Sequence, residues 1–274
     1  RDRLRSRGLG DVYKRQIERT ITDAGFTMVM QQIGTCDDEV KCGAVMEREK
    51  RLQGIVFLGG RFDYTPADLA MLNVPFVCCS YSNRYGTLIE GEYSSVSIAD
   101  GDTAQQAVEE LYRHGHRRIA ALISRPNDQS ISQLRYEGYV QALESHGIPV
   151  DPELVISTGG FDVRDAYSAV KAALERGADF TALFAIADSM AIGAMRALMD
   201  AGRRIPEDCS VIAIDGLELS AYIEPPLTTL CQPMEEMGRR SAEILLDMVR
   251  HKGSHACELL PTTLRQGRSV AAPR

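Results

Sequence analysis

Three charged side chains next to apolar runs are the residues of this sequence best suited to bind a polar molecule. Asp215 ends the run Ser210–Ile214, Asp188 follows the run 181–187, and Arg135 opens a helical pattern. In an open α/β sheet, ligands bind beyond the carboxyl ends of the strands. Carboxylates accept several hydrogen bonds and a guanidinium group donates five. The three residues are therefore predicted to bind a polyhydroxylated ligand.

Each of these residues also has a simpler structural interpretation. Asp188 can cap the helix expected over 189–201, a role that is compatible with ligand contact. Asp215 can form a turn with the glycine that follows it. Arg135 can lie on a helix surface and pair with an acid such as Glu137. The joint placement at strand-to-helix junctions favours a ligand site for all three.

The sequence lacks the signatures of common enzyme sites. It has no GxGxxG, GxxxxGK[ST], GxSxG or HExxH motif. Asp188 and Asp215 could form a carboxylate pair for glycoside hydrolysis, but there is no Trp for stacking on a sugar. His114 and His116 are interpreted as helix-end and turn residues. We therefore predict a binding protein, not an enzyme, with neither a cofactor nor a metal.

The charge of the chain is unevenly distributed. Residues 1–16 hold six Lys/Arg and two Asp, whereas 17–274 hold 25 basic and 36 acidic residues, a net of −11. An acidic body is repelled by DNA phosphates, so contact with DNA requires another module. Residues 1–16 form an atypical basic leader, interpreted as foreign or mistranslated sequence. The alternative is a basic tail that contacts nucleic acid or is disordered.

The cysteines indicate a reducing compartment. Their number is odd, no CxxC occurs, and several lie in expected strands, which favours free buried thiols in the cytoplasm. Cys78 and Cys79 are interpreted as core residues and not as ligands of a soft metal. The sequence has no run of about 18 apolar residues and no signal peptide, so we expect no membrane association. The seven are Cys36, Cys42, Cys78, Cys79, Cys209, Cys231 and Cys257.

Apolar runs alternate with amphipathic segments, which predicts an α/β fold with helices on both faces of parallel sheets. The clearest helix, 102–114, has apolar residues at helical spacing and stops at Gly115. Helices are also expected over 38–52, 66–72, 135–147, 162–176 (with Asp162 as N-cap), 189–201 and 235–250. Strands are expected over 27–33, 54–58, 75–79, 154–157, 181–187 and 210–214. Residues 115–123 form a basic turn that leads into a buried strand, and a further short strand is expected within 225–233.

Four motifs in order resemble the effector-binding core of the LacI family of bacterial transcriptional regulators. In 205–233, a strand ending in Asp precedes a Pro-Leu-Thr-Thr crossover. Gly115-His-Arg-Arg-Ile-Ala is similar to the motif that closes the family's N-terminal lobe. Arg135-Tyr-Glu-Gly-Tyr resembles the Arg-x-x-Gly-aromatic helix, whose Arg points into the effector cleft. The run 184–198 resembles the Asn-Asp-x-x-Ala-x-Gly segment, with Ala187 in place of Asn. Residues 259–265 resemble the family's final strand, and the resemblance as a whole covers about 17–270.

The resemblance implies two doubly wound parallel-sheet lobes of the periplasmic-binding-protein-like fold, joined by three crossovers. The N-terminal lobe is expected over 17–123 plus 232–253, and the C-terminal lobe over 124–231 plus 258–274. The family's first strand and its helix-turn-helix headpiece are not recognisable before the helical segment 16–25. Without a central strand, lower stability than that of an intact relative is expected.

The resemblance further implies the effector-sensing domain of a repressor, which binds a sugar or similar polar ligand between its lobes. Ser80 occupies the position where many members have a ligand-contacting Asp, so it joins Arg135, Asp188 and Asp215 as an expected contact. Operator DNA would be bound only through a headpiece absent from this chain, in a homodimer. The alternatives are a solute-binding protein of a transporter, which should carry a signal peptide, and a sugar-processing enzyme.

Overall fold

The computed structural model describes residues 9–34, 38–89 and 91–274, which form two compact units. The six-stranded unit comprises Ala99–Gln232 and Pro261–Arg274. The four-stranded unit comprises Gly10–Ile98 and Pro233–Leu260. Beyond residue 10, the chain passes from one unit to the other three times. This confirms the predicted α/β architecture of two parallel-sheet lobes joined by three crossovers.

The six-stranded unit is built on a sheet with the strand order β10-β8-β7-β6-β4-β5. All neighbouring strands are parallel except β10, which runs antiparallel to β8. Every residue of β4, β6 and β7 is buried, as expected for continuous apolar runs in a sheet covered on both faces. The strands are β4 (Ile119–Ile123), β5 (Val155–Ser157), β6 (Ala182–Ala185), β7 (Ser210–Asp215), β8 (Thr228–Cys231) and β10 (Thr263–Arg265).

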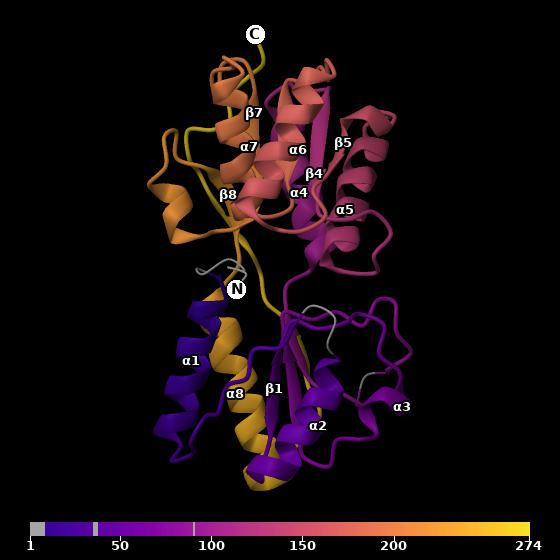
Figure 1. Cartoon of the computed structure of the whole chain (residues 1–274), viewed down its shortest axis with the longest axis vertical. Coiled ribbons are helices and arrows are strands. Elements are labelled where there is room, and N and C mark those ends of the chain that lie inside the picture. The colour runs from indigo at the N-terminus through magenta and orange to yellow at the C-terminus, as the bar shows by residue number, and fades with distance from the viewer. Residues whose placement is uncertain (1–8, 35–37, 90) are drawn as a thin grey trace. The chain divides into compact units, whose positions relative to one another are not determined.

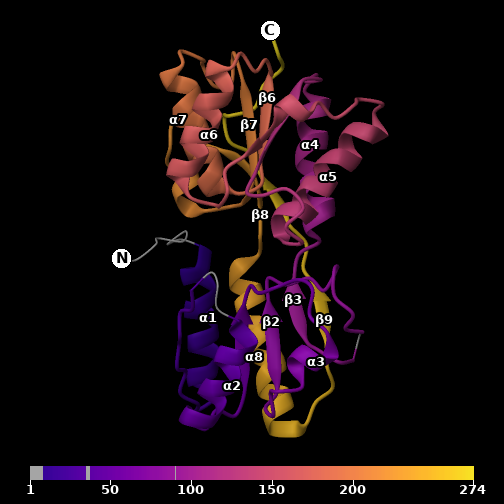
Figure 2. The same ribbon diagram turned by 45° about the vertical axis from the view of Figure 1, so that its right-hand side comes forward.

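Helices cover both faces of this sheet. Figure 2 shows α6 and α7 on one face and α4 and α5 on the other. Asp162 accepts a hydrogen bond from the Arg164 N–H at 2.8 Å and caps α6, as predicted. The helices are α4 (Asp100–Arg113), α5 (Ile131–Ser145), α6 (Val163–Glu175) and α7 (Asp188–Asp200), with the 3₁₀ turns η1 (Pro152–Leu154) and η2 (Glu218–Ala221).

Helices α4 and α5 approach each other closely because a glycine lies at their contact. A Cβ atom on Gly138 of α5 would lie 2.1 Å from the carbonyl oxygen of Gly101 in α4. No other residue fits there without displacing one of the helices. This contact matters for the site, since α5 carries Arg135 and α4 begins at Asp100.

Hydrogen bonds hold the C-terminal tail against the six-stranded sheet, near the amino-terminal end of β7. Ser269 is fully buried, and its Oγ donates to the Val211 carbonyl oxygen at 2.6 Å. His116 Nε2 lies 2.8 Å from the Ala271 carbonyl oxygen, and its Nδ1 lies 2.9 Å from Thr181 Oγ1. A carbonyl oxygen only accepts, so Nε2 carries the proton. His116 thus ties the tail to the sheet, a more specific role than that of a turn residue.

The four-stranded unit contains a fully parallel sheet with the order β1-β2-β3-β9. Helix α8 packs on β1, β2 and β3, and α1 lies beside α8 (Figure 1). The strands are β1 (Ile55–Leu58), β2 (Phe76–Cys79), β3 (Ser95–Ser97) and β9 (Cys257–Leu259). The helices are α1 (Leu9–Asp23), α2 (Glu39–Lys50), α3 (Pro66–Leu69) and α8 (Met234–His251).

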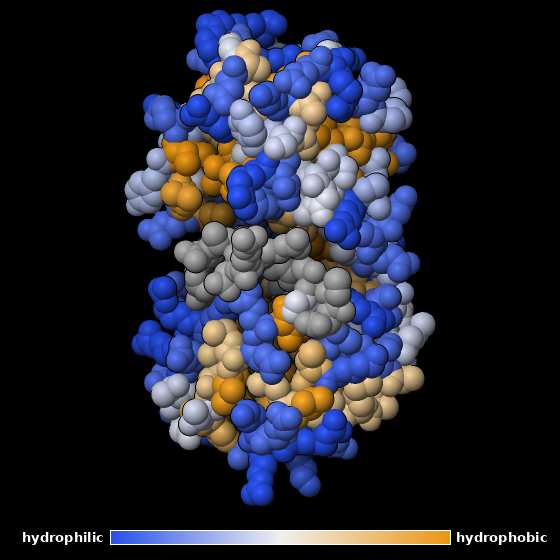
Figure 3. Space-filling model, in the orientation of Figure 1, coloured by the Kyte–Doolittle hydropathy of each residue, from blue (hydrophilic) through white to orange (hydrophobic). Residues whose placement is uncertain are grey.

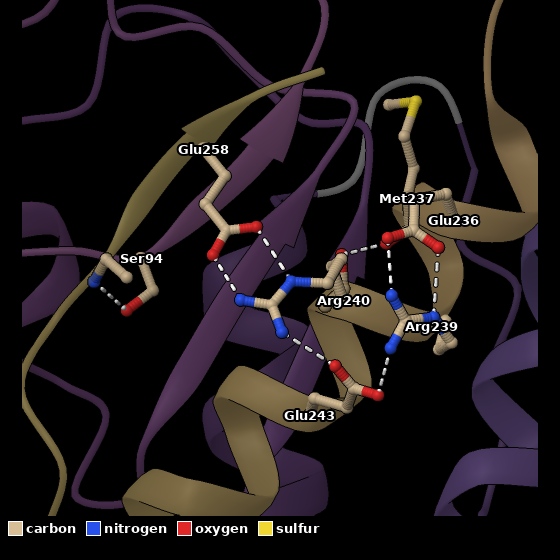
Figure 4. A network of polar contacts seen from close by, with 9 residues as sticks. Ser94, Glu236, Met237, Arg239, Arg240, Glu243 and Glu258 are labelled. Atoms are coloured by element: carbon tan, nitrogen blue, oxygen red, sulfur yellow. Dashed lines mark hydrogen bonds and ion pairs between the residues drawn. The ribbon is translucent and has the colours of Figure 1, made fainter.

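An ion network joins α8 to the edge strand β9 (Figure 4). Arg240 donates from Nε to Glu258 Oε2 at 2.9 Å and from Nη1 to Glu243 Oε2 at 2.7 Å. The neighbouring Arg239 pairs with Glu236 and Glu243, which both lie on α8 itself. Arg240 therefore connects two elements, whereas Arg239 connects residues of one helix.

The prediction of a strand over 27–33 is wrong. Residues 26–34 form no helix or strand, and Val29 and Met30 are 51% and 60% exposed. A strand requires a neighbour with which to share backbone hydrogen bonds. Among the described strands, β1 at the edge of the sheet pairs only with β2, so the segment has no partner there.

The boundaries of the units differ from the expected ones. α4 and β4 belong to the six-stranded unit, because β4 pairs with β5 and β6. The strand expected over 259–265 is divided into β9 and β10, which belong to different sheets on either side of Pro261. Residues 9–16, assigned to a foreign leader, form the first half of α1, where Tyr13 is buried. The rest of that leader lies outside the described residues.

The face of the molecule in Figure 3 is largely polar, with apolar residues in separate patches. Among the large apolar side chains of the six-stranded unit, Leu219 of η2 is 63% exposed. No helix within the described ranges combines the length and the apolar character needed to cross a lipid bilayer. The six cysteines in those ranges have free thiols, and burial raises the pKa of Cys78 and Cys79.

Candidate functional site

The candidate site lies in the six-stranded unit, at the carboxyl ends of β6 and β7. Arg135 donates from Nε to Asp100 Oδ1 at 2.9 Å and from Nη1 to Asp215 Oδ1 at 3.2 Å. Nη1 also donates to the carbonyl oxygen of Ile186, which follows β6. At most 8% of each of the three charged side chains is exposed. Two of the predicted residues, Arg135 and Asp215, therefore share one buried ion network.

Local geometry explains why these side chains meet. Arg135 and Gly138 are three residues apart on α5 and so share a helix face. The close approach at Gly138 brings that face against the first turn of α4, where Asp100 is the first residue. Asp215 is the last residue of β7, and its φ of 134° is one that residues with a side chain rarely adopt.

Two members of the network were not predicted from the sequence. Asp100 is the first residue of α4, and its carboxylate accepts a hydrogen bond from Arg135 Nε. Gln232 follows β8 and donates from Nε2 to Asp215 Oδ1 at 2.7 Å. Both residues stand at the junction of an element with a crossover, and that position is the signal that could have identified them.

Arg135 has one donor left over. Its Nη2 is buried and has no hydrogen-bond partner among the described residues. An unsatisfied buried donor costs about 1–3 kcal/mol, and more when it is charged. An oxygen atom of a ligand that accepted from Nη2 would remove that cost.

The electrostatics of the network are dominated by burial. Burial raises the pKa of Asp215 to about 7, with Asp188 adding to the rise and Arg135 opposing it. Burial also raises the pKa of Asp100, against the effect of Arg135. The two carboxylates raise the pKa of Arg135 despite its desolvation, so the guanidinium stays charged.

Asp188 is fully buried, and donors of the protein already occupy its oxygens. Oδ2 accepts from the Leu217 N–H at 2.8 Å and from Ser220 Oγ at 2.7 Å, and Oδ1 accepts from Thr229 Oγ1 at 2.6 Å. Asp188 is the first residue of α7, and no side chain caps this helix, so the capping interpretation is not borne out. Instead, Asp188 holds the segment that follows Asp215.

The remaining predicted residues are placed as follows. Arg135 is 1% exposed and does not lie on the helix surface, which excludes the interpretation as a surface partner of Glu137. Ser80 follows β2 in the four-stranded unit, with a φ of 59° and its N–H donated to the Val96 carbonyl oxygen at 2.8 Å. Over the described part of the chain, no three or more His, Cys, Asp or Glu residues are grouped to hold a metal ion.

Comparisons with known proteins agree with this architecture. Residues 108–270 match the family model of the periplasmic binding protein-like domain. The HTH-type transcriptional regulator MalR of Clostridium butyricum is 35% identical over 252 residues, which are 90% of this chain and 74% of MalR.

Solved structures give the same result. The complex of the transcriptional regulator CelR with cellobiose superposes with a TM-score of 0.83 at 29% identity, covering 96% of this chain and 79% of that one. A LacI family transcriptional regulator from Enterococcus faecium with bound ribose gives 0.82 at 26% identity, covering 97% and 95% of the two chains. The ordered motifs, the fold and these relatives together show that the chain belongs to the LacI family of transcriptional regulators.

Proposed function

We propose that this chain is the effector-sensing region of a repressor, and that its effector is an uncharged, polyhydroxylated molecule such as a sugar. The proposed contacts are Arg135, Asp100 and Asp215. The observation that carries the proposal is the buried Arg135 guanidinium, held by two carboxylates but left with an unsatisfied Nη2. A ligand oxygen in reach of Nη2 would complete its hydrogen bonds.

The charges favour a hydroxyl group over an anionic group as the ligand's contact. A hydroxyl can accept from Nη2 and donate to a carboxylate, so it suits both kinds of partner. The site has one guanidinium and two carboxylates, and a phosphate group would add negative charge to that set. Two similar structures contain cellobiose and ribose, which are uncharged and polyhydroxylated.

The other parts of the proposal come from the family. Operator DNA would be bound by a headpiece outside this chain, in the cytoplasm, by a homodimer that presents two headpieces to two half-sites. Ligand binding would shift the equilibrium between two states of the dimer that differ in DNA affinity. Ser80 is kept as a proposed ligand contact on the family resemblance alone. Asp188 is proposed to support the site indirectly, because its oxygens are occupied.

A solute-binding protein of a transporter is the alternative. The relatives compared above are transcriptional regulators, which favours the sensor. The same relatives favour a role in ligand binding for Asp188 and Asp215 over the alternative role as the carboxylate pair of a sugar-processing enzyme.

A thermal-shift screen followed by calorimetric titration tests the proposal. Cellobiose, ribose, ribose 5-phosphate and adenosine form the first panel. A ligand that binds only the folded state raises the melting temperature by mass action. We expect a rise with an uncharged sugar and none with the phosphorylated one. A cooperative melt that no sugar shifts, or a preference for the phosphate, contradicts the proposal.

The variant Asp215→Ala then tests the site. Loss of a hydrogen bond between the ligand and a charged group costs about 1.5–3 kcal/mol, so affinity should fall by about 10- to 100-fold. Arg268→Ala is the matched control, since Arg268 is exposed and pairs with Glu224 at 2.9 Å. Equal affinities of Asp215→Ala and the unmodified protein would show that the ligand binds elsewhere.

A further inference from the structure

The two carbonyl groups that follow Asp215 in the chain are bound by a single arginine. Arg265, the last residue of β10, donates from Nη1 to the Gly216 carbonyl oxygen at 3.4 Å and from Nη2 to that of Leu217 at 3.1 Å. Nη2 also donates to Ser220 Oγ in η2. One guanidinium thus holds the backbone of the segment 216–220, which we call the β7 loop.

Asp188 binds the donor groups of the same loop, whereas Arg265 binds its acceptor groups. Asp188 Oδ2 accepts from the Leu217 N–H and from Ser220 Oγ, and lies 3.9 Å from Arg265 Nη2. The peptide groups of Leu217 are therefore fixed on both sides, the N–H by Asp188 and the carbonyl by Arg265. Arg265 also supplies the positive charge that a fully buried carboxylate requires.

The loop needs such restraint because Asp215 is strained. A residue with a side chain rarely adopts a φ of 134°, and such a conformation persists only when its surroundings hold it. The next residue, Gly216, lies close against β8, since a Cβ there would lie 2.5 Å from Cys231 Sγ. Arg265 Nε is buried and has no hydrogen-bond partner among the described residues. The guanidinium therefore binds the loop carbonyl groups through Nη1 and Nη2 while its third nitrogen remains unpaired.

We propose that Arg265, acting with Asp188, is a positioning residue for Asp215. By holding the β7 loop, it keeps the Asp215 carboxylate on Arg135 Nη1 and Gln232 Nε2. The consequence for ligand affinity rests on the proposed function, but the positioning itself does not. It can therefore be tested without any ligand.

The test is the side-chain amide resonance of Gln232 in the ligand-free folded protein, measured by ¹H–¹⁵N NMR. This group donates to Asp215 Oδ1 at 2.7 Å and reports where the carboxylate lies. Arg265→Gln should shift the Gln232 resonance in the same direction as Asp215→Asn does. Exchange of the Leu217 amide proton should become about tenfold faster, as expected for the loss of about 1.4 kcal/mol of local stabilisation. Arg268→Gln is the matched control and should leave both signals unchanged.

Ser220→Ala provides a milder variant if Arg265→Gln does not fold. It removes the hydroxyl shared by Asp188 and Arg265 and should shift the same resonance by a smaller amount. An unchanged Gln232 resonance in a folded but less stable variant would overturn the proposal and leave Arg265 a purely structural role. Failure of every sugar to bind would contradict the proposed function without affecting this result.

Discussion

At the scale of single residues, Asp215 is the point where two buried networks meet. Its carboxylate belongs to the network of Arg135 and Gln232, and its backbone leads into the loop held by Asp188 and Arg265. Among the described residues, each network leaves one buried donor unsatisfied, Arg135 Nη2 in the first and Arg265 Nε in the second, but in the second network protein donors already occupy the oxygens of Asp188. This difference separates a residue that can contact a ligand from one that supports it.

Asp215 also makes stability depend on pH. Burial raises its pKa from 3.8 to about 7, so between these values the folded protein binds a proton that the unfolded chain has released. The contribution of this group to the free energy of unfolding is therefore largest below about pH 4 and is lost as the pH rises to about 7. Asp215→Asn should remove this component, which urea unfolding at about pH 5 and pH 8 would measure.

Another buried group works in the opposite direction and has to be separated from Asp215. Burial lowers the pKa of His116 from 6.5, so its contribution to stability is lost as the pH falls below that value. Because His116 is present in both proteins, the difference between the unmodified chain and Asp215→Asn isolates the carboxylate. An identical pH dependence of the two proteins would show that Asp215 titrates near its usual pKa.

At the scale of elements, the contact between α4 and α5 places Arg135 beside Asp100. Gly138→Ala would put a Cβ 2.1 Å from the Gly101 carbonyl oxygen, so the helices would have to separate. Overpacking of this kind costs about 1–3 kcal/mol, and a fall in the free energy of unfolding of that size is expected in urea titrations.

Gly101→Ala is the matched control for that contact. A Cβ at Gly101 would lie 3.6 Å from the Leu134 carbonyl oxygen, an ordinary van der Waals distance. This substitution should be neutral or stabilising by up to about 1 kcal/mol, because Ala loses less backbone entropy than Gly in a helix. Equal stabilities of the two alanine variants would contradict the close contact.

The ion network of α8 allows a comparison of two neighbouring arginines. Arg240→Met breaks the link between α8 and β9, whereas Arg239→Met removes pairs within α8 only (Figure 4). We expect Arg240→Met to lower the melting temperature by about 2–4 °C, and Arg239→Met to leave it nearly unchanged. Equal changes in the melting temperatures of the two variants would indicate that the pair of Arg240 with Glu258 adds nothing to stability. Differential scanning fluorimetry is sufficient for the comparison.

At the scale of the whole molecule, the sequence predicts elements better than it predicts their neighbours. The buried strands β4, β6 and β7 are recognisable because each is a continuous apolar run. Segment 27–33 also contains apolar residues but has no partner strand among the described residues, and pairing depends on residues far away in the chain. The first passage between units lies at Ile98–Ala99, whereas the family resemblance implies a boundary at 123.

The site shows the same limit. Arg135 and Asp215 are predicted because strand ends and helix starts can be located along the chain. Asp100 joins them only through the approach of α4 to α5, which depends on three-dimensional packing. Arg265 contacts the β7 loop from the strand after the last passage between units, and no local pattern marks it.

The division of each unit along the chain has a consequence for synthesis on the ribosome. Strands β4 to β8 of the six-stranded unit come from one continuous stretch, Ala99–Gln232. The four-stranded unit begins at Gly10 but needs α8 and β9, which lie beyond Gln232. Of the two units, the one whose first segment is translated earlier therefore cannot complete its core until residues beyond Gln232 have been translated. During that interval, the faces of β1, β2 and β3 that α8 later covers are available to chaperones.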